Sequence, residues 1–239
     1  MLNKLFLPVL LLCSCSSWHS VNNVPNRNWY PDTIAQYHND FTKKHYPARI
    51  KVFKSEPLEQ GDIVFLGNSI TELGRDWSSR FGVPNIKNRG IAGDITDGVL
   101  LRLNEIIYSQ PKAVFLLIGV NDLYNIRDHG GVPSPEYVAN NILKIAKTIY
   151  RSSPYTNVFV QTILPTRDQS LKENIKLVNR IIKEKEQSGF YHVVDLYSEF
   201  VGQDGYLPKA LTKDGTHLNE GGYAKWVKFL YPLVEKTDE

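Results

Sequence analysis

Cysteine is almost absent from this sequence. Of 239 residues only two are cysteines, Cys13 and Cys15, and both lie within the first fifteen positions. The chain beyond them contains no disulfide, so its fold must be stabilised by an apolar core. Clusters of cysteine and histidine with the spacing of metal ligands are also lacking, although the chain has six histidines. We therefore expect neither a metal site nor a cofactor.

An excess of charge of one sign is lacking as well. The 28 lysines and arginines are scattered among 25 acidic residues, which leaves a formal charge of +3. Nucleic-acid binding favours a concentrated basic stripe, so this class of partner is not indicated. The 42% hydrophobic and 22% charged residues are instead typical of an ordinary globular protein.

The apolar run near the N-terminus is short. It covers Leu5–Leu12, follows Lys4 and is interrupted by Pro8. Such a run is too short to span a bilayer as a helix and is typical of a secretory signal. It ends in LCSC, residues 12–15, which resembles a bacterial lipoprotein processing site.

We therefore expect residues 1–14 to be a signal peptide and Cys15 to be lipidated, because Ser14 is small enough to precede the cut. A plain signal peptide, cleaved nearby without lipidation, is the alternative. Residues 15–28 are polar and predict a tether. The protein would then be a lipid-anchored lipoprotein of the cell envelope, in the outer membrane or periplasm, or else a secreted protein. In the first case its lipid anchor is the only membrane contact that we expect.

Strand and helix patterns alternate from residue 63 onward. The apolar segment AVFLLIG, 113–119, is typical of a strand buried on both faces of a parallel sheet. The alternation predicts a three-layer α/β/α fold with a flavodoxin-like, doubly wound sheet of five parallel strands. We expect strands at 63–67, 85–89, 113–119, 157–164 and 191–196, and helices at about 96–109, 135–152, 170–187 and 219–235.

The length of the chain fits one globular domain, which we place at 29–239. Its first part predicts an accessory helix that starts near Asp32, behind Pro31, and that Pro47 kinks or divides. That helix carries no motif that indicates a function.

Small and polar residues collect where the predicted strands end. They are GNS, 67–69; NRGIAGD, 88–94; GVNDLY, 119–124; and, before the last helix, DGTHLNEGG, 214–222. In a doubly wound sheet, sites form outside the carboxyl ends of the strands. These segments supply a hydroxyl, an imidazole, a carboxylate and small or amide donors, which are the parts of an acyl-transfer site.

The four segments resemble, in order and in spacing, the four sequence blocks of the SGNH (GDSL) hydrolases, and the similarity spans about 62–230. The residues that carry it are Gly67-Asn68-Ser69-Ile70, Gly90, Gly119-x-Asn121-Asp122 and Asp214-x-x-His217. FLGNSITE, NRGIAGD and IGVNDL are also similar to the branch with platelet-activating-factor acetylhydrolase-like and carbohydrate O-acetylesterase proteins. One departure is Asn68, where the family usually has aspartate; we expect it to tune the activity rather than abolish it.

This resemblance implies the SGNH hydrolase fold and a serine esterase. Ser69 would be the nucleophile, which needs a base within hydrogen-bond distance, and His217 would be that base. Asp214 would orient the imidazole and stabilise its protonated form. The oxyanion would be bound by the backbone N–H groups of Ser69 and Gly90 and by the side-chain amide of Asn121. A side chain at Gly90 would, on this view, crowd the ester carbonyl.

We expect an extracytoplasmic enzyme that removes acetyl or other short acyl groups, such as O-acetyl groups on sialic acid or other glycans. One alternative is a lysophospholipase or another hydrolase of short-chain lipid esters. Another is a non-catalytic carbohydrate-binding lipoprotein on the same fold. Ser69 could also simply cap the following helix, with Glu72 completing a capping box. The elbow motif of the α/β-hydrolases is excluded, since it needs a glycine where Thr71 stands.

The remaining polar candidates are expected to be structural or solvated. His38 and His45 are predicted on the surface of the accessory helix, and His192 at the start of the fifth strand. Asp94 is expected to brace the loop that contains Gly90, or to cap the helix after it. Arg167 is expected in solvent, with contact to an acidic substrate as the alternative.

Overall fold

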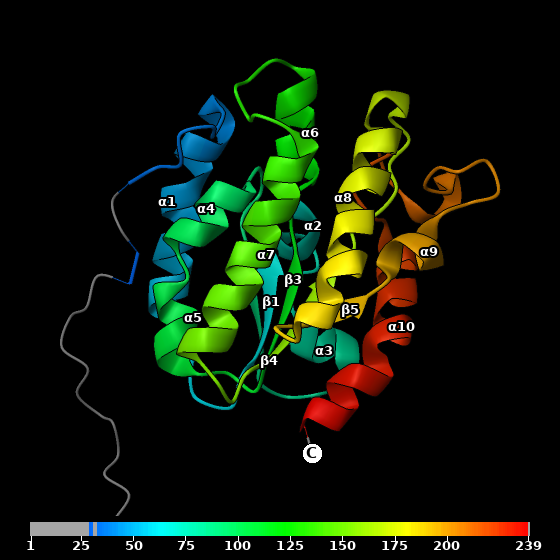
Figure 1. Ribbon diagram of the computed structural model, residues 1–239. Coiled ribbons are helices and arrows are strands. Elements are labelled where there is room, and N and C mark those ends of the chain that lie inside the picture. Colours follow the sequence, from blue (N-terminus) through cyan, green and yellow to red (C-terminus); the bar gives the residue numbers. More distant parts are fainter. Residues whose placement is uncertain (1–28, 31–32, 239) are drawn as a thin grey trace, which may run out of the picture.

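A parallel sheet of five strands forms the centre of the protein in this computed structural model, which describes residues 29–30 and 33–238 (Figure 1). The strands have the order β2-β1-β3-β4-β5, so the predicted doubly wound parallel sheet is confirmed. Their bounds are β1 (Ile63–Gly67), β2 (Ile86–Gly90), β3 (Ala113–Leu117), β4 (Asn157–Gln161) and β5 (His192–Val194). The predicted signal peptide, Cys15 and tether lie outside the described residues.

The two central strands are apolar because both of their faces are covered. β1, IVFLG, and β3, AVFLL, are buried at every position. Across the sheet Gly67 pairs with both Gly90 and Leu117, so the first three strands end level with one another. The segments that follow these strands therefore meet at one edge of the sheet.

Helices cover both faces of the sheet, which gives the three predicted layers (Figure 1). One face carries α3 (Trp77–Phe81) and α10 (Glu220–Asp238), which contact each other. The other face carries α4 (Thr96–Leu101), α5 (Asn104–Ser109), α7 (Pro135–Ser152) and α8 (Lys172–Lys185). The shorter helices are α2 (Ser69–Glu72), α6 (Val120–Arg127), α9 (Leu196–Phe200), η1 (Gln169–Leu171), η2 (Glu186–Ser188) and η3 (Lys209–Leu211).

Aromatic side chains join the sheet to the α3/α10 layer. Phe65 of β1 stacks on Trp77 of α3 with ring centroids 4.4 Å apart, and Trp77 meets Trp226 of α10 edge-on at 4.9 Å. Phe115 of β3 continues the row, 5.1 Å from Phe65. All four side chains are fully buried, so this core fixes α10 against the strand that leads to Ser69.

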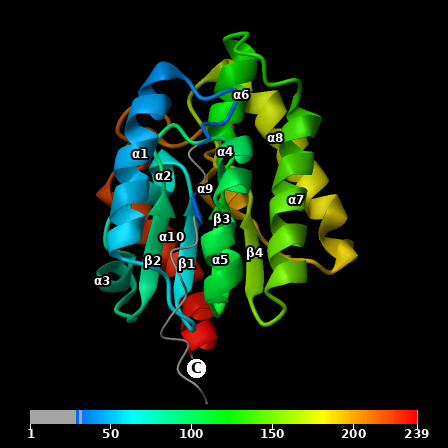
Figure 2. The ribbon, with the colours of Figure 1, turned by 90° about the vertical axis from the view of Figure 1, so that its left-hand side faces the viewer.

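The accessory helix begins later than predicted. Helix α1 spans Asp40–Ser55, continues through Pro47, and is capped by Asn39, whose side chain accepts the N–H of Thr42 at 2.8 Å. It lies on the β2 side of the molecule (Figure 2). Its apolar side packs with the segments before it and after β2 in a small cluster of Tyr30, Tyr46, Ile50, Phe53 and Ile91.

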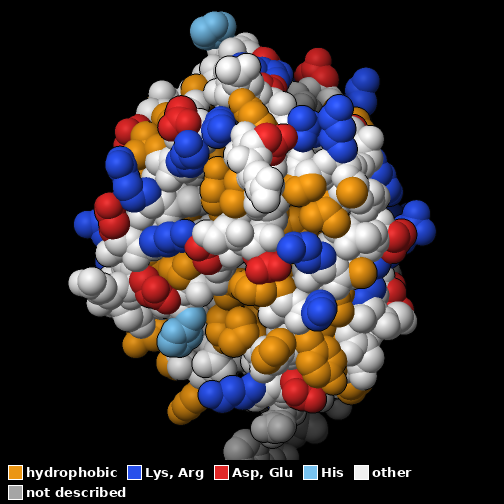
Figure 3. Space-filling model, turned by 90° about the vertical axis from the view of Figure 1, so that its right-hand side faces the viewer, with side chains coloured by type: hydrophobic (Ala, Val, Ile, Leu, Met, Phe, Trp, Pro, Cys, Tyr) orange, Lys and Arg blue, Asp and Glu red, His pale blue; other side chains and the backbone are white. Residues whose placement is uncertain are grey.

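The surface has no large region of one charge on the face seen in Figure 3. There, lysine and arginine side chains alternate with acidic ones and with apolar patches. This mixture agrees with the small net charge of the sequence. Within residues 29–30 and 33–238, no helix is long and apolar enough to cross a membrane.

Candidate active site

Ser69, His217 and Asp214 lie in a hydrogen-bonded row at the carboxyl edge of the sheet. The Oγ of Ser69 is 2.9 Å from Nε2 of His217, and Nδ1 of that ring is 2.6 Å from Oδ2 of Asp214. The structure thus brings together the three residues predicted as nucleophile, base and orienting carboxylate. Ser69 is itself buried, while the other two are partly exposed.

The tight loop before α10 orients the imidazole. Asp214 Oδ1 accepts the backbone N–H groups of Thr216 at 2.9 Å and of His217 at 2.8 Å, so the carboxylate folds back onto the ring. Gly215 between them has φ +96°, a conformation that favours glycine. Burial raises the pKa of Asp214, but the hydrogen bonds from the ring and backbone of His217 outweigh it and lower this pKa to about 2. The carboxylate is therefore ionised beside the imidazole at neutral pH.

Ser69 is not the cap of helix α2. The cap is Asn68, whose Oδ1 accepts the N–H of Ile70 at 3.0 Å, and Ser69 is the first residue of the helix. Glu72 does not complete a capping box either, because its carboxylate accepts the N–H of Ala92 instead, at 2.5 Å. The capping interpretation of Ser69 is wrong, and its hydroxyl faces the imidazole. The neutral Asn68 thus makes a turn bond to the backbone with its side-chain oxygen.

Gly90 does not offer the N–H that we predicted for the oxyanion. Its N–H already donates to Oδ1 of Asn88 at 2.9 Å, so it is not available to an oxyanion in this conformation. A Cβ at Gly90 would lie 2.2 Å from the backbone nitrogen of Glu72. Glycine is therefore required here by the close approach of α2, and not by the space that an ester needs.

Gly93 takes the place of Gly90 in the site. Within the described residues, the N–H groups of Gly93 and Ser69 donate to no other group. Gly93 also lines the same cavity as Asn121. The available donors at this edge are thus the backbone N–H groups of Ser69 and Gly93 and the amide of Asn121.

The segment after β3 is held by buried polar bonds. One N–H of the Asn121 amide donates to the carbonyl of Asp94 at 2.8 Å, which orients the amide. Its second N–H is left available to an oxyanion. Asp122 is fully buried and accepts the N–H and the hydroxyl of Thr96. Burial raises the pKa of Asp122 to about 7, although the bonds from Thr96 act in the opposite direction. Asp122 therefore anchors the start of α4 and does not face the site.

Two cavities are lined by residues of the candidate site or by their chain neighbours. The first has a volume of about 10 Å³ and is largely apolar; it is lined by Asn68, Ile70, Leu117, Ile118, Val120, Ile163, Leu164, Thr166 and Thr216. The second has about 220 Å³ and a larger polar share; it is lined by Tyr37, Asn39, Gly93, Ile95, Asn121, Tyr124, Asn125, Asp128 and Gly130. The narrow apolar space is thus bounded by chain neighbours of Ser69 and His217, and the wider polar one by Gly93 and Asn121.

Two of the minor predictions need correction. His38 is buried, not on the surface, and its Nε2 lies 2.9 Å from Oδ1 of Asp94. His45 is half-buried, with its Nε2 3.0 Å from the carboxylate of Glu72.

The other minor candidates are placed as follows. His192 is exposed at the start of β5. Arg167 is partly exposed and donates to the carbonyl of Leu207 at 3.0 Å. Asp94 does brace the loop, as predicted.

Tyr124 was not recognised from the sequence, although it lies in the GVNDLY segment. Its hydroxyl is 2.6 Å from Oγ1 of Thr216, the residue before the imidazole, so it links α6 to the loop of Asp214 and His217. No group of three or more histidine, cysteine, aspartate or glutamate side chains suited to a metal ion occurs in the described part of the chain.

The comparisons with known proteins agree with this geometry. The model of the GDSL-like lipase/acylhydrolase family matches residues 65–225. Human platelet-activating factor acetylhydrolase IB subunit alpha2 is 29% identical over 193 residues, which covers 76% of this chain and 81% of that protein.

Two solved structures illustrate the likeness in fold. A GDSL-like lipase of Bacteroides thetaiotaomicron has a TM-score of 0.66 at 24% identity, and covers 84% of this chain and 98% of its own. A catalytic mutant of an acetylxylan esterase of Geobacillus stearothermophilus has a TM-score of 0.59 at 16% identity, and covers 76% and 95%. At these identities the two structures show the fold alone. The resemblance inferred from the four sequence blocks is confirmed by the match to the family.

Proposed function

Because the chain belongs to the GDSL-like lipase/acylhydrolase family and is a carboxylic ester hydrolase, we propose that it removes acetyl groups from carbohydrates through a covalent intermediate on Ser69. The observation that carries this proposal is the contact of 2.9 Å between Ser69 Oγ and His217 Nε2, with Asp214 behind the ring. The non-catalytic alternative offers no reason for such a row of groups.

The reaction follows from the positions of these groups. Ser69 Oγ attacks the ester carbonyl while His217 Nε2 takes its proton, and the tetrahedral oxyanion is bound by N–H groups of Ser69, Gly93 and Asn121. The imidazolium, stabilised by Asp214, then gives its proton to the leaving alcohol. A water molecule, deprotonated by the same imidazole, then attacks the acyl-enzyme. The imidazolium returns this proton to Ser69 Oγ as the carbon–oxygen bond to the serine breaks and the carboxylic acid leaves.

The small cavity supports a short acyl group. Its walls include Ile70 and Thr216, the chain neighbours of Ser69 and His217, together with Val120 and Ile163. A volume of about 10 Å³ is roughly what one water molecule requires, and a methyl group is of similar size. The methyl of an acetyl group fits such a space, whereas each further methylene would have to displace buried side chains.

The larger cavity supports a carbohydrate as the alcohol. Tyr37 and Tyr124 offer aromatic faces, and Asn39, Asn125 and Asp128 offer polar groups around a space of about 220 Å³. Sugar rings present hydroxyl groups at their edges and C–H groups on their faces, which suits a mixed lining of this kind. A long hydrocarbon chain would find fewer apolar partners there.

A lipid acetyl ester is the second candidate. It is favoured by the curated relatives, which are named platelet-activating factor acetylhydrolases. The two candidates share the acyl group and differ in the alcohol. Only an assay that varies the leaving alcohol therefore distinguishes them.

Acetate release from a panel of substrates tests both candidates. The panel comprises O-acetylated sialic acid, acetylated xylan oligosaccharides and an acetylated ether phospholipid, with Ser69→Ala as the inactive control. We expect the sugars to be hydrolysed with a higher kcat/KM than the lipid, and Ser69→Ala to release no acetate above background. Preference for the lipid would support the second candidate, and equal release by Ser69→Ala would contradict the mechanism.

We also propose that the enzyme acts outside the cytoplasm, anchored by a lipid on Cys15. This proposal is supported by the apolar run and the LCSC segment, residues 12–15, which lie outside the described residues. Labelling of cells with a radioactive fatty acid, followed by fractionation of the envelope, tests it. The label should be found on the wild-type protein and be lost in Cys15→Ala, whereas an unlabelled wild-type protein would contradict the anchor.

A further inference from the structure

Helix α1 lies against the loop that follows β2. That loop, residues 91–95, carries the N–H of Gly93 and leads into α4. Helix α1 (Asp40–Ser55) precedes the segment that matches the family model, which begins at residue 65. Its contacts to the loop are therefore made from outside the matched segment.

The first set of contacts runs through Glu72. Its Oε2 accepts the N–H of Ala92 at 2.5 Å, and Nε2 of His45 lies 3.0 Å from each carboxylate oxygen. The Nε of Arg49 is 3.5 Å from Oε1 of the same carboxylate and donates to the carbonyl of Gly90 at 3.2 Å. Two side chains of α1 thus fix the carboxylate that holds the loop just before the proposed oxyanion donor.

The second set of contacts runs through Asp94, on the other side of that donor. Its Oδ1 lies 2.9 Å from Nε2 of His38, in the segment leading into α1, and its Oδ2 accepts Nε of Arg102 at 3.0 Å. The carbonyl of Asp94 accepts the amide of Asn121 at 2.8 Å. The position of Asp94 therefore affects two oxyanion donors at once.

Gly93 itself touches the first turn of α1. A Cβ built on this glycine would lie 2.0 Å from Oγ1 of Thr42, so helix and loop are in direct contact there. Three successive loop residues, Ala92, Gly93 and Asp94, are thus each held by the α1 segment or by a carboxylate that α1 fixes. Contacts needed only for stability would not have to converge on the loop that carries the proposed oxyanion donor.

We propose that α1 is a positioning element of the active site, in which His45 and Arg49 act through Glu72 to aim the N–H of Gly93. This inference rests on the proposed function, because it assigns α1 a role in binding the oxyanion of the ester reaction. Neither side chain touches the substrate. Their loss moves the donor relative to the transition state and leaves substrate binding almost unchanged, so kcat falls while KM stays.

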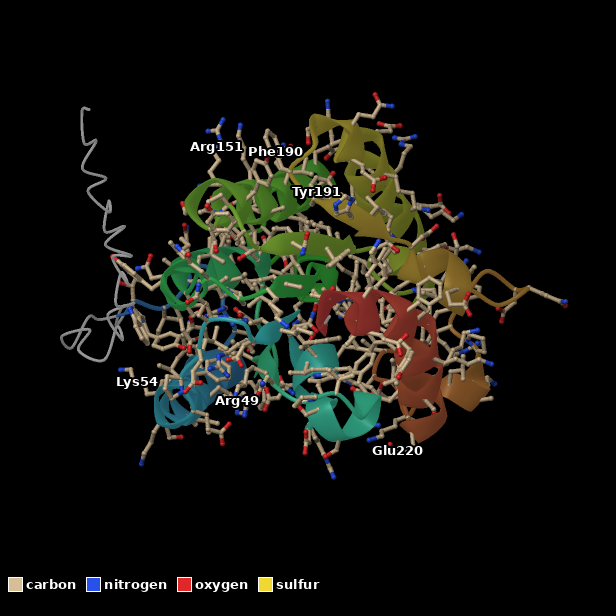
Figure 4. The ribbon with its side chains drawn as sticks, turned by 90° about the horizontal axis from the view of Figure 1, so that it is seen from below. Arg49, Lys54, Arg151, Phe190, Tyr191 and Glu220 are labelled. Atoms are coloured by element: carbon tan, nitrogen blue, oxygen red, sulfur yellow. The ribbon has the colours of Figure 1, made fainter. Side chains whose placement is uncertain are left out.

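Steady-state kinetics with p-nitrophenyl acetate test the role of α1. The variants are Arg49→Met, His45→Leu and His45→Gln, in which the glutamine amide can still donate to Glu72. Lys54→Met is the matched control, since it removes a cation from the same helix. Figure 4 shows Arg49 on the side of α1 that faces the rest of the molecule, whereas Lys54 points outward. Thermal unfolding is recorded for each variant, and Arg49→Lys serves as the milder change should a variant fail to fold.

We expect kcat to fall about tenfold to a hundredfold in Arg49→Met and His45→Leu, with KM within about twofold, since displacement of a reacting group by about 1 Å costs on this order. His45→Gln should recover most of the rate, and Lys54→Met should match the wild type. Folded variants that keep the kcat of the wild type would overturn the proposal. A rise in KM that accounts for the whole loss of kcat/KM would overturn it as well. An inactive wild-type protein would instead contradict the proposed function.

Discussion

The Oγ of Ser69 lies 2.9 Å from the Nε2 of His217, although 148 positions separate the two residues in the chain. Their contact depends on how α10 is docked. The hydroxyl of Tyr223, in the first part of that helix, is buried and donates to the carbonyl of Ile70 at 2.7 Å. The residue after the serine is thereby tied to the helix that follows the histidine, which keeps nucleophile and base in register.

The carboxyl of Asp214 should stay ionised far into the acidic range. Its pKa is lowered to about 2, below the usual value of roughly 3.9. The ionised form therefore contributes stability that is fully present above about pH 4 and is lost as the pH falls towards 2. Carbon-13 NMR of labelled aspartate should show no titration of Asp214 between pH 7 and pH 4. A midpoint near pH 4 would contradict the hydrogen bonds assigned to it.

Alanine at Gly93 should reduce kcat by about a hundredfold, the usual cost of one oxyanion donor. Gly93 has φ +79°, and a Cβ there would meet Thr42, so the N–H would be displaced. Gly82→Ala is the matched control, because Gly82 has φ +67° with nothing near its Cβ position. Both variants should lose stability because of the positive φ, and Gly93→Ala should lose more because of the clash with Thr42. Only Gly93→Ala should lose kcat on p-nitrophenyl acetate. An equal kcat in the two variants would remove Gly93 from the site.

Truncation of Ile163 should widen the acyl specificity. Its side chain is buried and lines the small cavity together with Asn68 and Ile70, the chain neighbours of Ser69. In Ile163→Ala, the ratio of kcat/KM for p-nitrophenyl butyrate to that for the acetate should rise about tenfold or more, because a methylene in a fitted pocket is worth on this order. Ile145→Ala makes the same change in the core side of α7 and should leave the ratio unaltered. If Ile163→Ala and Ile145→Ala both keep the wild-type ratio, Ile163 does not set the preference for acetate.

Removing only one partner of the ion pair between Arg89 and Glu105 should lower the free energy of unfolding. Both side chains are buried, and the guanidinium donates to the two carboxylate oxygens at 2.8 and 2.9 Å. Arg89→Met leaves Glu105 buried without its partner, which should cost about 3–5 kcal/mol in the free energy of unfolding. The double variant Arg89→Met/Glu105→Gln should recover part of this loss. Unfolding in urea measures both, and a single-variant cost below about 1 kcal/mol would contradict the assignment.

The catalytic row could be predicted because its members stand in segments that resemble the SGNH blocks, and the local patterns around them place these segments at one edge of the sheet. The apolar segment of β1 indicates where Ser69 stands, and the segment before the last helix places Asp214 and His217 at the same edge. The strand ends were less accurate: β3 ends at Leu117 rather than 119, and β4 at Gln161 rather than 164. Periodicity alone does not mark where a buried apolar chain leaves the sheet.

One error arose where a side chain finds its partner far along the chain. His38 has the local pattern of a surface residue, yet its partner Asp94 is 56 positions away. The assignment of Gly90 failed for a local reason, because its N–H donates to Oδ1 of Asn88, only two residues earlier. Local patterns therefore predicted the elements and their order, while the partners of single polar groups were missed both near and far along the chain.

Covalent labelling tests the central claim most directly. A fluorophosphonate probe reacts with a serine whose hydroxyl is activated by a neighbouring base, and mass spectrometry of the digested protein locates the adduct. We predict one adduct, on Ser69, which is absent from Ser69→Ala and forms far more slowly in His217→Gln. An unmodified Ser69 in folded, wild-type protein, or labelling that His217→Gln does not slow, would contradict the account.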